Sequence, residues 1–489
     1  MHTLLKNIFF FLLLMTRQDD AGAQPLRNTP VLLQGKVTDE KGRGLPGVAV
    51  TDGSSIVNTD ANGSYRFYTT SGAPFVYLTL PSGYEIPNEK GIARFYQPIK
   101  AVKGAFTANF RLKKLDQPDT KHFAIVWADP QINTDAQAQK LITVSAPDTK
   151  EHVADLLKEG PVHGLTAGDI YWDNFAMIPP YKKAVAVIGI PFFQVLGNHD
   201  MDINVRSDEA SDNTFHEHFG PSWYSFNRGN AHYVVLDNVF YYANGYNYIG
   251  YITEQQLQWL EQDLAGVKPG APVFVSMHIS CYTHEKRRNK KAADNPGNIT
   301  FNRQALYGLL KPFNAHLLTG HTHYNENVQE GGVYEHITAA LSGAWWTENI
   351  CSDGTPAGYG VYEVDGNNVT WYYKSVGFPK SYQMRVYNRG RYPGRPTAVA
   401  VNVWNWDKDW KVEWIEDGKE MGAMKQETAQ DADAIDKMAG ADKPGTYAWI
   451  EPGMTDHLFF ATPSSSAKKI EIIVTDRFGN RYKETLHLN

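Results

Sequence analysis

Five apolar segments in the middle of the chain each end in side chains that can bind metal ions. The segments and the polar residues that follow them are 126–128 before Asp129-Pro130-Gln131, 165–167 before Gly168-Asp169, 193–196 before Gly197-Asn198-His199-Asp200, 273–277 before His278, and 317–319 before Gly320-His321-Thr322-His323. Short apolar segments bounded by polar residues predict buried strands. Because functional sites of α/β sheets collect at the carboxyl ends of strands, we expect these side chains to meet in one place.

The chemistry of these side chains indicates a metal centre. They offer carboxylate, amide and imidazole donors without thiolate, which suits Mn, Fe, Zn or Mg. Asp169 has two oxygens and is suited to bridge two divalent ions, and His321 and His323 can reach different ions from one turn. Paired ions sit ~3.5–4 Å apart and lower the pKa of bound water from 15.7 towards ~7. Their positive charge also offsets the negative charge of a phosphate ester, which otherwise repels hydroxide.

The motif Gly197-Asn198-His199-Asp200 also predicts catalytic residues. Consecutive loop residues project in different directions, so Asn198 can ligate a metal while His199 faces the substrate as an acid or a charge stabiliser. We expect Asp200 to fix the tautomer of His199.

The surrounding sequence predicts three folded parts. Residues 120–376 alternate strand and helix signals, which is typical of an α/β domain. Residues 30–115 have short strands with Asn-Gly and Asp-Gly turns and predict an N-terminal β-sandwich. Residues 380–489 return to β character and predict a C-terminal β-sandwich, in which the polar, alanine-rich stretch 420–443 is expected to be a helix or a long loop.

The N-terminus predicts export. Residues 1–23 combine Lys6, an apolar run over 8–15 and the small-x-small sequence Ala21-Gly22-Ala23, which is typical of a secretory signal peptide cleaved near Ala23. The apolar run is too short to span a bilayer, and no later run is long enough. We therefore expect a secreted or periplasmic protein without a transmembrane segment.

Composition excludes several classes of protein. The chain has 489 residues, of which 42% are apolar and 20% charged, so it is neither disordered nor a coiled-coil rod. Its net charge of −6 argues against general nucleic-acid binding. The only cysteines, Cys281 and Cys351, exclude a disulfide framework and a Cys-rich metal site. Whether these two cysteines pair stays open.

The chain resembles the calcineurin-like metallophosphoesterases in the order and spacing of five motifs. These are Asp-x-Gln, Gly-Asp, Gly-Asn-His-Asp, a lone His after a strand, and Gly-His-x-His. The resemblance covers residues 120–375 and implies an α/β/β/α sandwich with a binuclear metal site above its sheets. Residues 35–67 resemble the prealbumin-like modules of exported bacterial proteins. The whole arrangement resembles exported bacterial family members with N- and C-terminal β-domains.

The same resemblance implies a role for each residue. The first metal would be held by Asp129, Gln131 and His323, and the second by Asn198, His278 and His321. Asp169 would bridge the two ions, and His199 would be the catalytic histidine. The usual first motif is Asp-x-His, so Gln131 departs from it, although a subset of the family carries Asp-Pro-Gln. An amide oxygen is a harder and weaker ligand than imidazole, which leaves the metal at this position open.

The expected function is hydrolysis of phosphate esters by metal-activated hydroxide, with diesters slightly favoured over monoesters. The substrate would be a small-molecule or cell-envelope phosphoester, contacted by Trp172, Asn174 and His284. The alternative is an exported glycan- or envelope-binding protein with a vestigial metal site. The basic run 286–291 is either a solvated loop or a recruiter of anionic substrates. The sequence does not indicate the oligomeric state.

Overall fold

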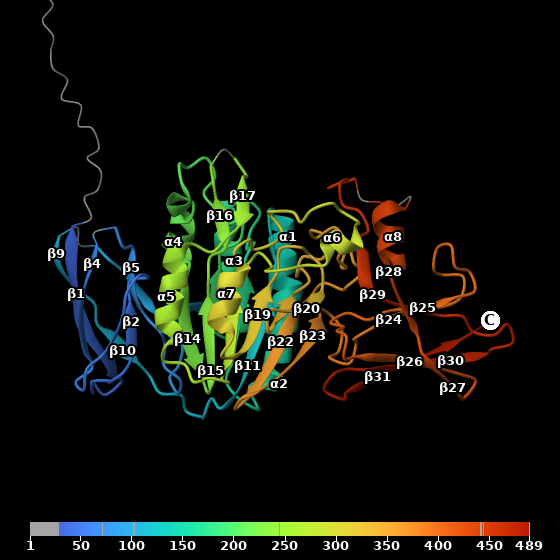
Figure 1. Ribbon diagram of the computed structural model, residues 1–489, viewed down its shortest axis with the longest axis horizontal. Coiled ribbons are helices and arrows are strands. Elements are labelled where there is room, and N and C mark those ends of the chain that lie inside the picture. Colours follow the sequence, from blue (N-terminus) through green and yellow to red (C-terminus); the bar gives the residue numbers. More distant parts are fainter. Residues whose placement is uncertain are drawn as a thin grey trace, which may run out of the picture.

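The computed structural model describes residues 29–70, 72–100, 103–243, 245–440, 443 and 445–488. The signal peptide expected over residues 1–23 lies outside the described residues. A central α/β part is flanked by β-rich parts near each end of the described chain (Figure 1). The fold class predicted from the sequence is therefore confirmed.

Two sheets form the middle of the molecule. The first has the order β23-β22-β11-β12-β13-β7-β6, with β6 (Asn88–Glu89), β7 (Ile92–Ala93), β11 (Lys121–Trp127), β12 (Val162–Ala167), β13 (Phe192–Val195), β22 (Gly358–Asp365) and β23 (Asn368–Ser375). The second has the order β14-β15-β18-β19-β21-β20, with β14 (Tyr224–Arg228), β15 (Ala231–Val235), β18 (Pro272–Ser276), β19 (Asn314–Thr319), β20 (Glu326–Glu330) and β21 (Val333–Ile337). β11, β12 and β13 are parallel to one another, as are β18 and β19. Within each sheet, the expected strands therefore end at the same edge.

The period-two pattern of these strands explains the layers. On β11, Ala124 and Val126 belong to the apolar cluster between the two sheets, whereas Phe123, Ile125 and Trp127 pack on the other face, under helices. Both faces of the strand are thus covered, which is why the segment is a continuous apolar run.

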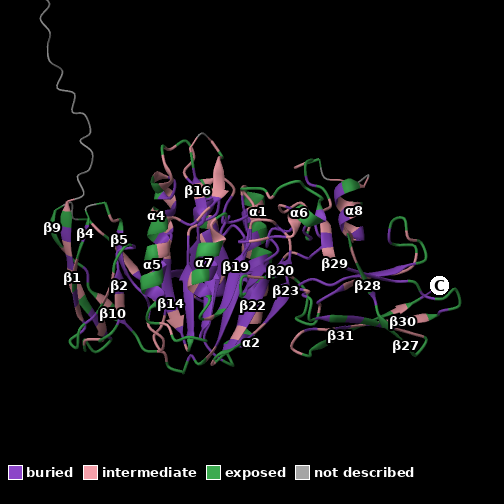
Figure 2. Ribbon diagram, viewed as in Figure 1, coloured by how far each residue is buried: buried purple, intermediate pink, exposed green. Residues whose placement is uncertain are grey.

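Helices cover the outer face of each sheet. The first sheet packs under α1 (Asp135–Lys140), a π-helical turn (Leu141–Ser145), α2 (Ala146–Leu156) and α3 (Ile178–Ile188), and the second under α5 (Glu254–Leu264) and α7 (Arg303–Leu310). The remaining elements of this part are α4 (Asn213–Phe219), α6 (Glu285–Arg288), β16 (Val239–Tyr241), β17 (Tyr248–Gly250) and two short 3₁₀ helices (Phe175–Met177 and Asp208–Ala210). Figure 2 shows the central strands buried, with α5 and α7 exposing one side. The middle is thus the expected α/β/β/α sandwich.

The N-terminal part contains two four-stranded sheets. One joins β1 (Pro30–Asp39), β4 (Ser64–Thr70), β9 (Gly104–Thr107) and β10 (Phe110–Leu112), and the other joins β2 (Ala49–Thr51), β3 (Ile56–Asn58), β5 (Phe75–Leu78) and β8 (Tyr96–Pro98). The short strands β6 and β7 lie within the same stretch of sequence but extend the central sheet, because Ile92 pairs with Phe192 of β13. The N-terminal stretch therefore contributes to the central part as well.

The C-terminal part also contains two four-stranded sheets. They are β24 (Arg385–Tyr387), β25 (Val399–Asn402), β28 (Lys425–Gln430) and β29 (Met454–Ala461), and β26 (Lys411–Glu416), β27 (Lys419–Ala423), β30 (Lys469–Thr475) and β31 (Arg481–His487). The stretch 420–443 was expected to be a helix or a long loop. Its later part contains the helix α8 (Ala432–Ala439), whereas its first part forms most of β27 and all of β28. All residues of β27 are exposed, so this edge strand lacks the apolar alternation that signals a strand.

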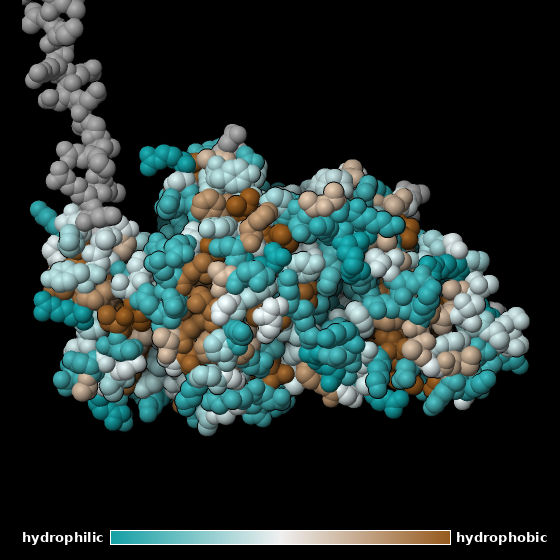
Figure 3. Space-filling model, viewed as in Figure 1, coloured by the Kyte–Doolittle hydropathy of each residue, from teal (hydrophilic) through white to brown (hydrophobic). Residues whose placement is uncertain are grey.

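Three further features concern the surface, the helices and the cysteines. The face in Figure 3 is mainly hydrophilic, with apolar residues in separate groups. Within the described residues no helix has the length and apolar character needed to cross a bilayer. Cys281 and Cys351 are both buried and both free, which answers the question of their pairing.

The core between the two sheets contains four buried histidines, His122, His163, His316 and His336. His122 stacks near His163 at 6.0 Å between ring centroids, and His316 Nδ1 lies 3.0 Å from His336 Nε2. Burial lowers the pKa of all four, to about 4 for His122 and about 3 for His316. These imidazoles are therefore neutral in the folded protein at neutral pH.

We predict that the free energy of unfolding falls between pH 7 and pH 5. In the unfolded chain these histidines return to a pKa of about 6.5, so the unfolded state takes up protons first as the pH drops. The loss is roughly 2 kcal/mol per histidine by pH 5. Urea unfolding at both pH values measures it. His316→Gln should flatten the pH dependence, whereas the exposed-site control His487→Gln should not; equal slopes in both variants would contradict the account.

Candidate metal centre

The loops after five central strands bring all seven predicted ligands together. His278, after β18, is at the centre of one group: its Nε2 lies 3.0 Å from Asn198 Oδ1, 3.1 Å from His321 Nδ1 and 3.2 Å from Asp169 Oδ1. Asp169, His278 and His321 each offer one ligand atom, and these three atoms lie within 4.8 Å of one another. These residues are up to about 150 positions apart in the sequence, and only the parallel strands make them neighbours.

The remaining predicted ligands lie beside this group, and Gln131 contacts Asp169 directly. Gln131 Nε2 donates to Asp169 Oδ2 at 2.8 Å, and His323 Nε2 lies 3.5 Å from Asp129 Oδ1. The backbone N–H of His321 donates to Asp129 at 3.0–3.1 Å. The two carboxylate oxygens of Asp169 thus face different groups, one towards His278 and the other towards Gln131.

Backbone strain is concentrated at these residues. Positive φ angles occur at Asp129 (49°), Gln131 (39°), Asp169 (48°), His321 (69°) and His323 (56°). Such left-handed conformations are uncommon for residues other than glycine and cost of order 1–3 kcal/mol each. The surrounding sandwich holds five of the seven predicted ligands in this conformation, which points their side chains at one another.

The glycines of the motifs are required by close packing. A Cβ atom would lie 2.3 Å from His278 Nδ1 at Gly168, 2.1 Å from the Asp169 backbone nitrogen at Gly197, and 2.5 Å from Asp129 Oδ2 at Gly320. Each distance is far below van der Waals contact. The Gly-Asp, Gly-Asn-His-Asp and Gly-His-x-His motifs therefore carry glycine because the ligand side chains occupy the space of a side chain there.

The donor set fits divalent cations. Asp129 and Asp169 are buried, and a buried carboxylate needs a compensating positive charge. Two further buried atoms of the cluster, Gln131 Oε1 and His323 Nδ1, have no hydrogen-bond partner among the described residues. Buried polar atoms are normally satisfied, so these two are available to a ligand that the protein atoms do not provide.

Electrostatics shows the same shortage of positive charge. Burial works to lower the pKa of His278, but the charge of Asp169 and the hydrogen bond to it raise that pKa to about 9. Burial alone would raise the pKa of Asp169, yet the charges of His278 and His199 hold it well below its usual range. Without another cation, a histidinium neutralises the aspartate; a bound metal ion supplies that charge directly.

His199 lies at the edge of this cluster. Its backbone N–H donates to Asp169 Oδ1 at 3.0 Å, and its imidazole Nδ1 lies 3.0 Å from both carboxylate oxygens of Asp173. The side chain retains 22% exposure, whereas those of His278 and His323 are almost completely buried. Among the predicted site histidines, His199 is therefore well placed to face a substrate.

The structure corrects the role expected for Asp200. Its carboxylate does not orient His199 but accepts backbone N–H groups from Gly197, Ile170 and Tyr171 at 2.9–3.3 Å. Asp200 thus holds the loops after β12 and β13 together, and Asp173 occupies the position expected for it. The sequence did not indicate this role for Asp173, because nothing in the local pattern shows that its carboxylate turns towards His199.

Of the three predicted substrate contacts, the structure places only Trp172 beside the cluster, with its ring 5.7 Å from that of His199. Asn174 instead donates to the backbone oxygen of Asn133 at 2.8 Å and accepts from the Ala176 N–H at 3.2 Å. Both ends of its amide are therefore hydrogen-bonded to backbone groups.

His284 is likewise used elsewhere. Its Nδ1 lies 2.5 Å from Glu326 Oε1, in a separate cavity between the central and C-terminal parts. The neighbouring basic run is also engaged there. Arg287 forms an ion pair with Asp456 at 2.5 Å, and Arg288 pairs with Glu326 at 2.7 Å and lies 3.8 Å from Asp456. These two arginines therefore join two parts of the protein.

The sequence pattern did not identify two aromatic residues that lie beside this cluster. Tyr447 and Trp449, between α8 and β29, lie 5.1 and 6.2 Å from Trp172 between ring centroids. Trp449 also lies 4.6 Å from Trp345, whose ring stacks on His323 at 4.2 Å. The only available signal was two aromatic residues in an otherwise polar segment, and nothing in it indicated contact with a loop almost 280 positions earlier.

Several solved structures are similar to this chain. They include a dimetal phosphatase from Danio rerio (14% identity over 53% of this chain and 97% of that one, TM-score 0.35) and purple acid phosphatase PPD1 from yellow lupin, Lupinus luteus (13%, 71% and 72%, TM-score 0.38). A putative 5'-nucleotidase from Staphylococcus aureus matches at 12% identity over 52% and 53%, with a TM-score of 0.34. No curated protein matches the chain.

Family models match most of the chain in consecutive segments. The model described as calcineurin-like phosphoesterase matches residues 128–325, which contain all seven predicted ligands, from Asp129 to His323. The models described as the N terminal and C terminal of calcineurin-like phosphoesterase match residues 32–115 and 335–482. The chain belongs to the calcineurin-like phosphoesterase family.

Proposed function

We propose that the protein hydrolyses phosphate esters at a centre of two divalent cations. The observation that carries this proposal is the convergence of seven side chains with oxygen or nitrogen donors in one cluster, in which the two oxygens of Asp169 face different groups. One ion would be held by Asp129, Gln131 and His323, and the other by Asn198, His278 and His321, with Asp169 shared between them. The cations could be Mn, Fe, Zn or Mg, since all accept such ligands.

The side chains around this centre would assist the reaction in distinct ways. Bound divalent cations supply the charge that attracts an anionic ester and acidify water. Water adds to phosphorus as the bond to the leaving oxygen breaks, and that oxygen must gain a proton. His199 is positioned to donate it, because Asp173 holds its Nδ1 at 3.0 Å and the ring is partly exposed.

We also propose a preference for diesters over monoesters. The rings of His199 and His323 have aromatic and acidic neighbours: Trp172, Asp173, Trp345 and Asp129. A diester carries one negative charge at neutral pH, whereas a monoester carries almost two. A rim of aromatic groups with an additional carboxylate favours the less charged ester.

Hydrolysis can be tested with bis-(p-nitrophenyl) phosphate and p-nitrophenyl phosphate in the presence of Mn, Fe, Zn or Mg. We expect metal-dependent release of nitrophenol, faster from the diester. Asp169→Asn should lower the rate roughly thousandfold, equal to about 4 kcal/mol of barrier, because it removes the shared ligand. Asp155→Asn, on an exposed aspartate of α2, should keep the rate. No turnover with any of the metals would favour the alternative, a binding protein with a vestigial metal site.

Gln131 provides an independent test of the metal ligands. Gln131→His should tighten metal binding about tenfold, which equals ~1.4 kcal/mol, because imidazole replaces a weaker amide ligand. Chelator competition measures the affinity without reference to catalysis. Gln139→His, on the exposed surface of α1, is the matched control. An affinity unchanged by Gln131→His would count against Gln131 as a ligand.

We further propose that the protein is exported and cleaved near Ala23. The support is the sequence of residues 1–23, with its apolar run and small-x-small site. N-terminal sequencing of the protein from its natural host should begin shortly after Ala23. A mature protein that still begins at Met1 would rule out this cleavage.

A further inference from the structure

A chain of aromatic contacts runs around one side of the proposed metal centre. From His199 it passes to Trp172 (5.7 Å between ring centroids), then to Trp449 (6.2 Å), Trp345 (4.6 Å) and finally His323 (4.2 Å). Tyr447 packs beside it, 5.1 Å from Trp172. We name Trp172, Trp345, Tyr447 and Trp449 the aromatic rim. Both ends of the rim rest on histidines of the site, so a group attached to a bound phosphate lies within its reach.

Two different parts of the protein build the aromatic rim. Trp172 follows Asp169 in the loop after β12, and Trp345 lies in the loop between β21 and β22. Tyr447 and Trp449 come from the C-terminal part, between α8 and β29. The metal centre is therefore complete within the central part, whereas the rim is complete only when the C-terminal part is docked.

Apolar packing fixes the C-terminal half of the rim. Ile450, next to Trp449, is buried in a cluster with Ala344 and Ile350 of the central part and Met438 of α8. Trp345 and Tyr447 pack against the same cluster. Lys437 of α8 adds an ion pair with Glu348 at 2.5 Å, and the Gly453 N–H donates to the Ser352 oxygen at 2.8 Å. Both sides of the segment that carries Trp449 are therefore attached to the central part.

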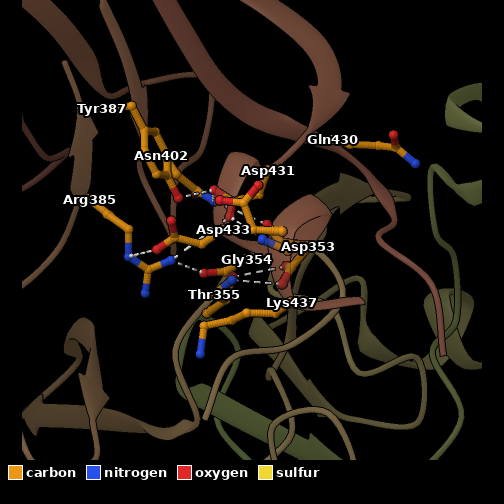
Figure 4. A network of polar contacts seen from close by, with 12 residues as sticks. Asp353, Gly354, Thr355, Arg385, Tyr387, Asn402, Gln430, Asp431, Asp433 and Lys437 are labelled. Atoms are coloured by element: carbon orange, nitrogen blue, oxygen red, sulfur yellow. Dashed lines mark hydrogen bonds and ion pairs between the residues drawn. The ribbon is translucent and has the colours of Figure 1, made fainter. Parts of the chain in front are cut away.

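A buried polar network holds α8 in the same place (Figure 4). Asp431 caps α8 by accepting the Ala434 N–H at 3.0 Å, and it also accepts from Tyr387 and Asn402 at 2.7 and 2.8 Å. Asn402 in turn donates to the Asp353 oxygen, and Arg385 donates to the Gly354 oxygen, both in the central part. Such a network fixes one relative orientation of the two parts, because each partner lost leaves a buried polar group unsatisfied.

The shape of the rim indicates what it binds. Its rings meet at steep or tilted angles (73° between Trp345 and Trp449, 89° between Trp172 and Trp449), so no pair forms a parallel slot. Trp449 nevertheless leaves 54% of its surface exposed. A large exposed indole fixed beside a reaction site offers one flat face to a ligand, and stacking a ring on such a face is worth ~1–3 kcal/mol.

We propose that the aromatic rim is the subsite for a ring-bearing group of the phosphoester substrate, completed by the C-terminal part. The ring, either planar and aromatic or a saturated sugar-like ring, stacks on Trp449 while the phosphate lies at the metal centre. This inference rests on the proposed function, since it assigns the second substituent of the ester that the centre would cleave.

The test measures binding of three phosphonates that cannot be hydrolysed: ethylphosphonate, 2-phenylethylphosphonate and 2-cyclohexylethylphosphonate. Each is titrated calorimetrically into the metal-loaded full-length protein. We expect the ring-bearing ligands to bind about tenfold more tightly than ethylphosphonate. Trp449→Ala should abolish this advantage and leave ethylphosphonate binding unchanged, and Trp449→Phe should keep most of it. Tyr68→Ala removes another exposed aromatic side chain, in the N-terminal part, and should change nothing.

The outcomes separate the two proposals. A phenyl preference identifies a planar aromatic group, and a cyclohexyl preference identifies a saturated ring. Either result, or an equal gain from both rings over ethylphosphonate, supports the rim. Equal affinity of all three ligands, or an advantage that survives Trp449→Ala, would overturn the rim, even in a protein that hydrolyses nitrophenyl esters. Ring-dependent binding without hydrolysis would instead overturn the proposed reaction and leave the rim supported.

Discussion

The site depends on the burial of two carboxylates, Asp129 and Asp169, within one cluster of histidines and amides. Buried negative charge is costly unless positive charge lies against it, and the described protein supplies only imidazoles for that purpose. Gln131 Oε1 and His323 Nδ1 are left without protein partners, and five ligand positions adopt left-handed backbone conformations. Bound cations would neutralise the buried carboxylates and bind the unpartnered atoms. Such cations are the simplest explanation for finding all these unfavourable features in one place.

The same constraint accounts for the architecture around the site. Parallel strands in each sheet send successive loops to one edge, and packing two such sheets face to face brings the loops of both to a common centre. The motif glycines allow those loops to approach closely. The helices that cover the outer faces leave this edge open, so the ligands are buried while His199 remains partly exposed.

Much of this was predictable from the sequence, because the informative signals are local. The apolar segments before Asp129, Asp169, Asn198, His278 and His321 are strands, and their order along the chain identifies the family. Contacts between distant segments were not predictable. The partner of His199 is Asp173 rather than Asp200, and Trp449 reaches the site only through the docking of α8; neither contact leaves a periodic pattern. β27 was missed because an exposed edge strand needs no apolar alternation.

The central claim is that these side chains hold a pair of divalent cations around Asp169. Anomalous X-ray diffraction from crystals of the Mn-loaded protein tests it directly, because it locates each ion without reference to activity. The account predicts two anomalous peaks ~3.5–4 Å apart, one on each side of the Asp169 carboxylate. Crystals that show no peak beside Asp169, at manganese concentrations that saturate binding in solution, would contradict it.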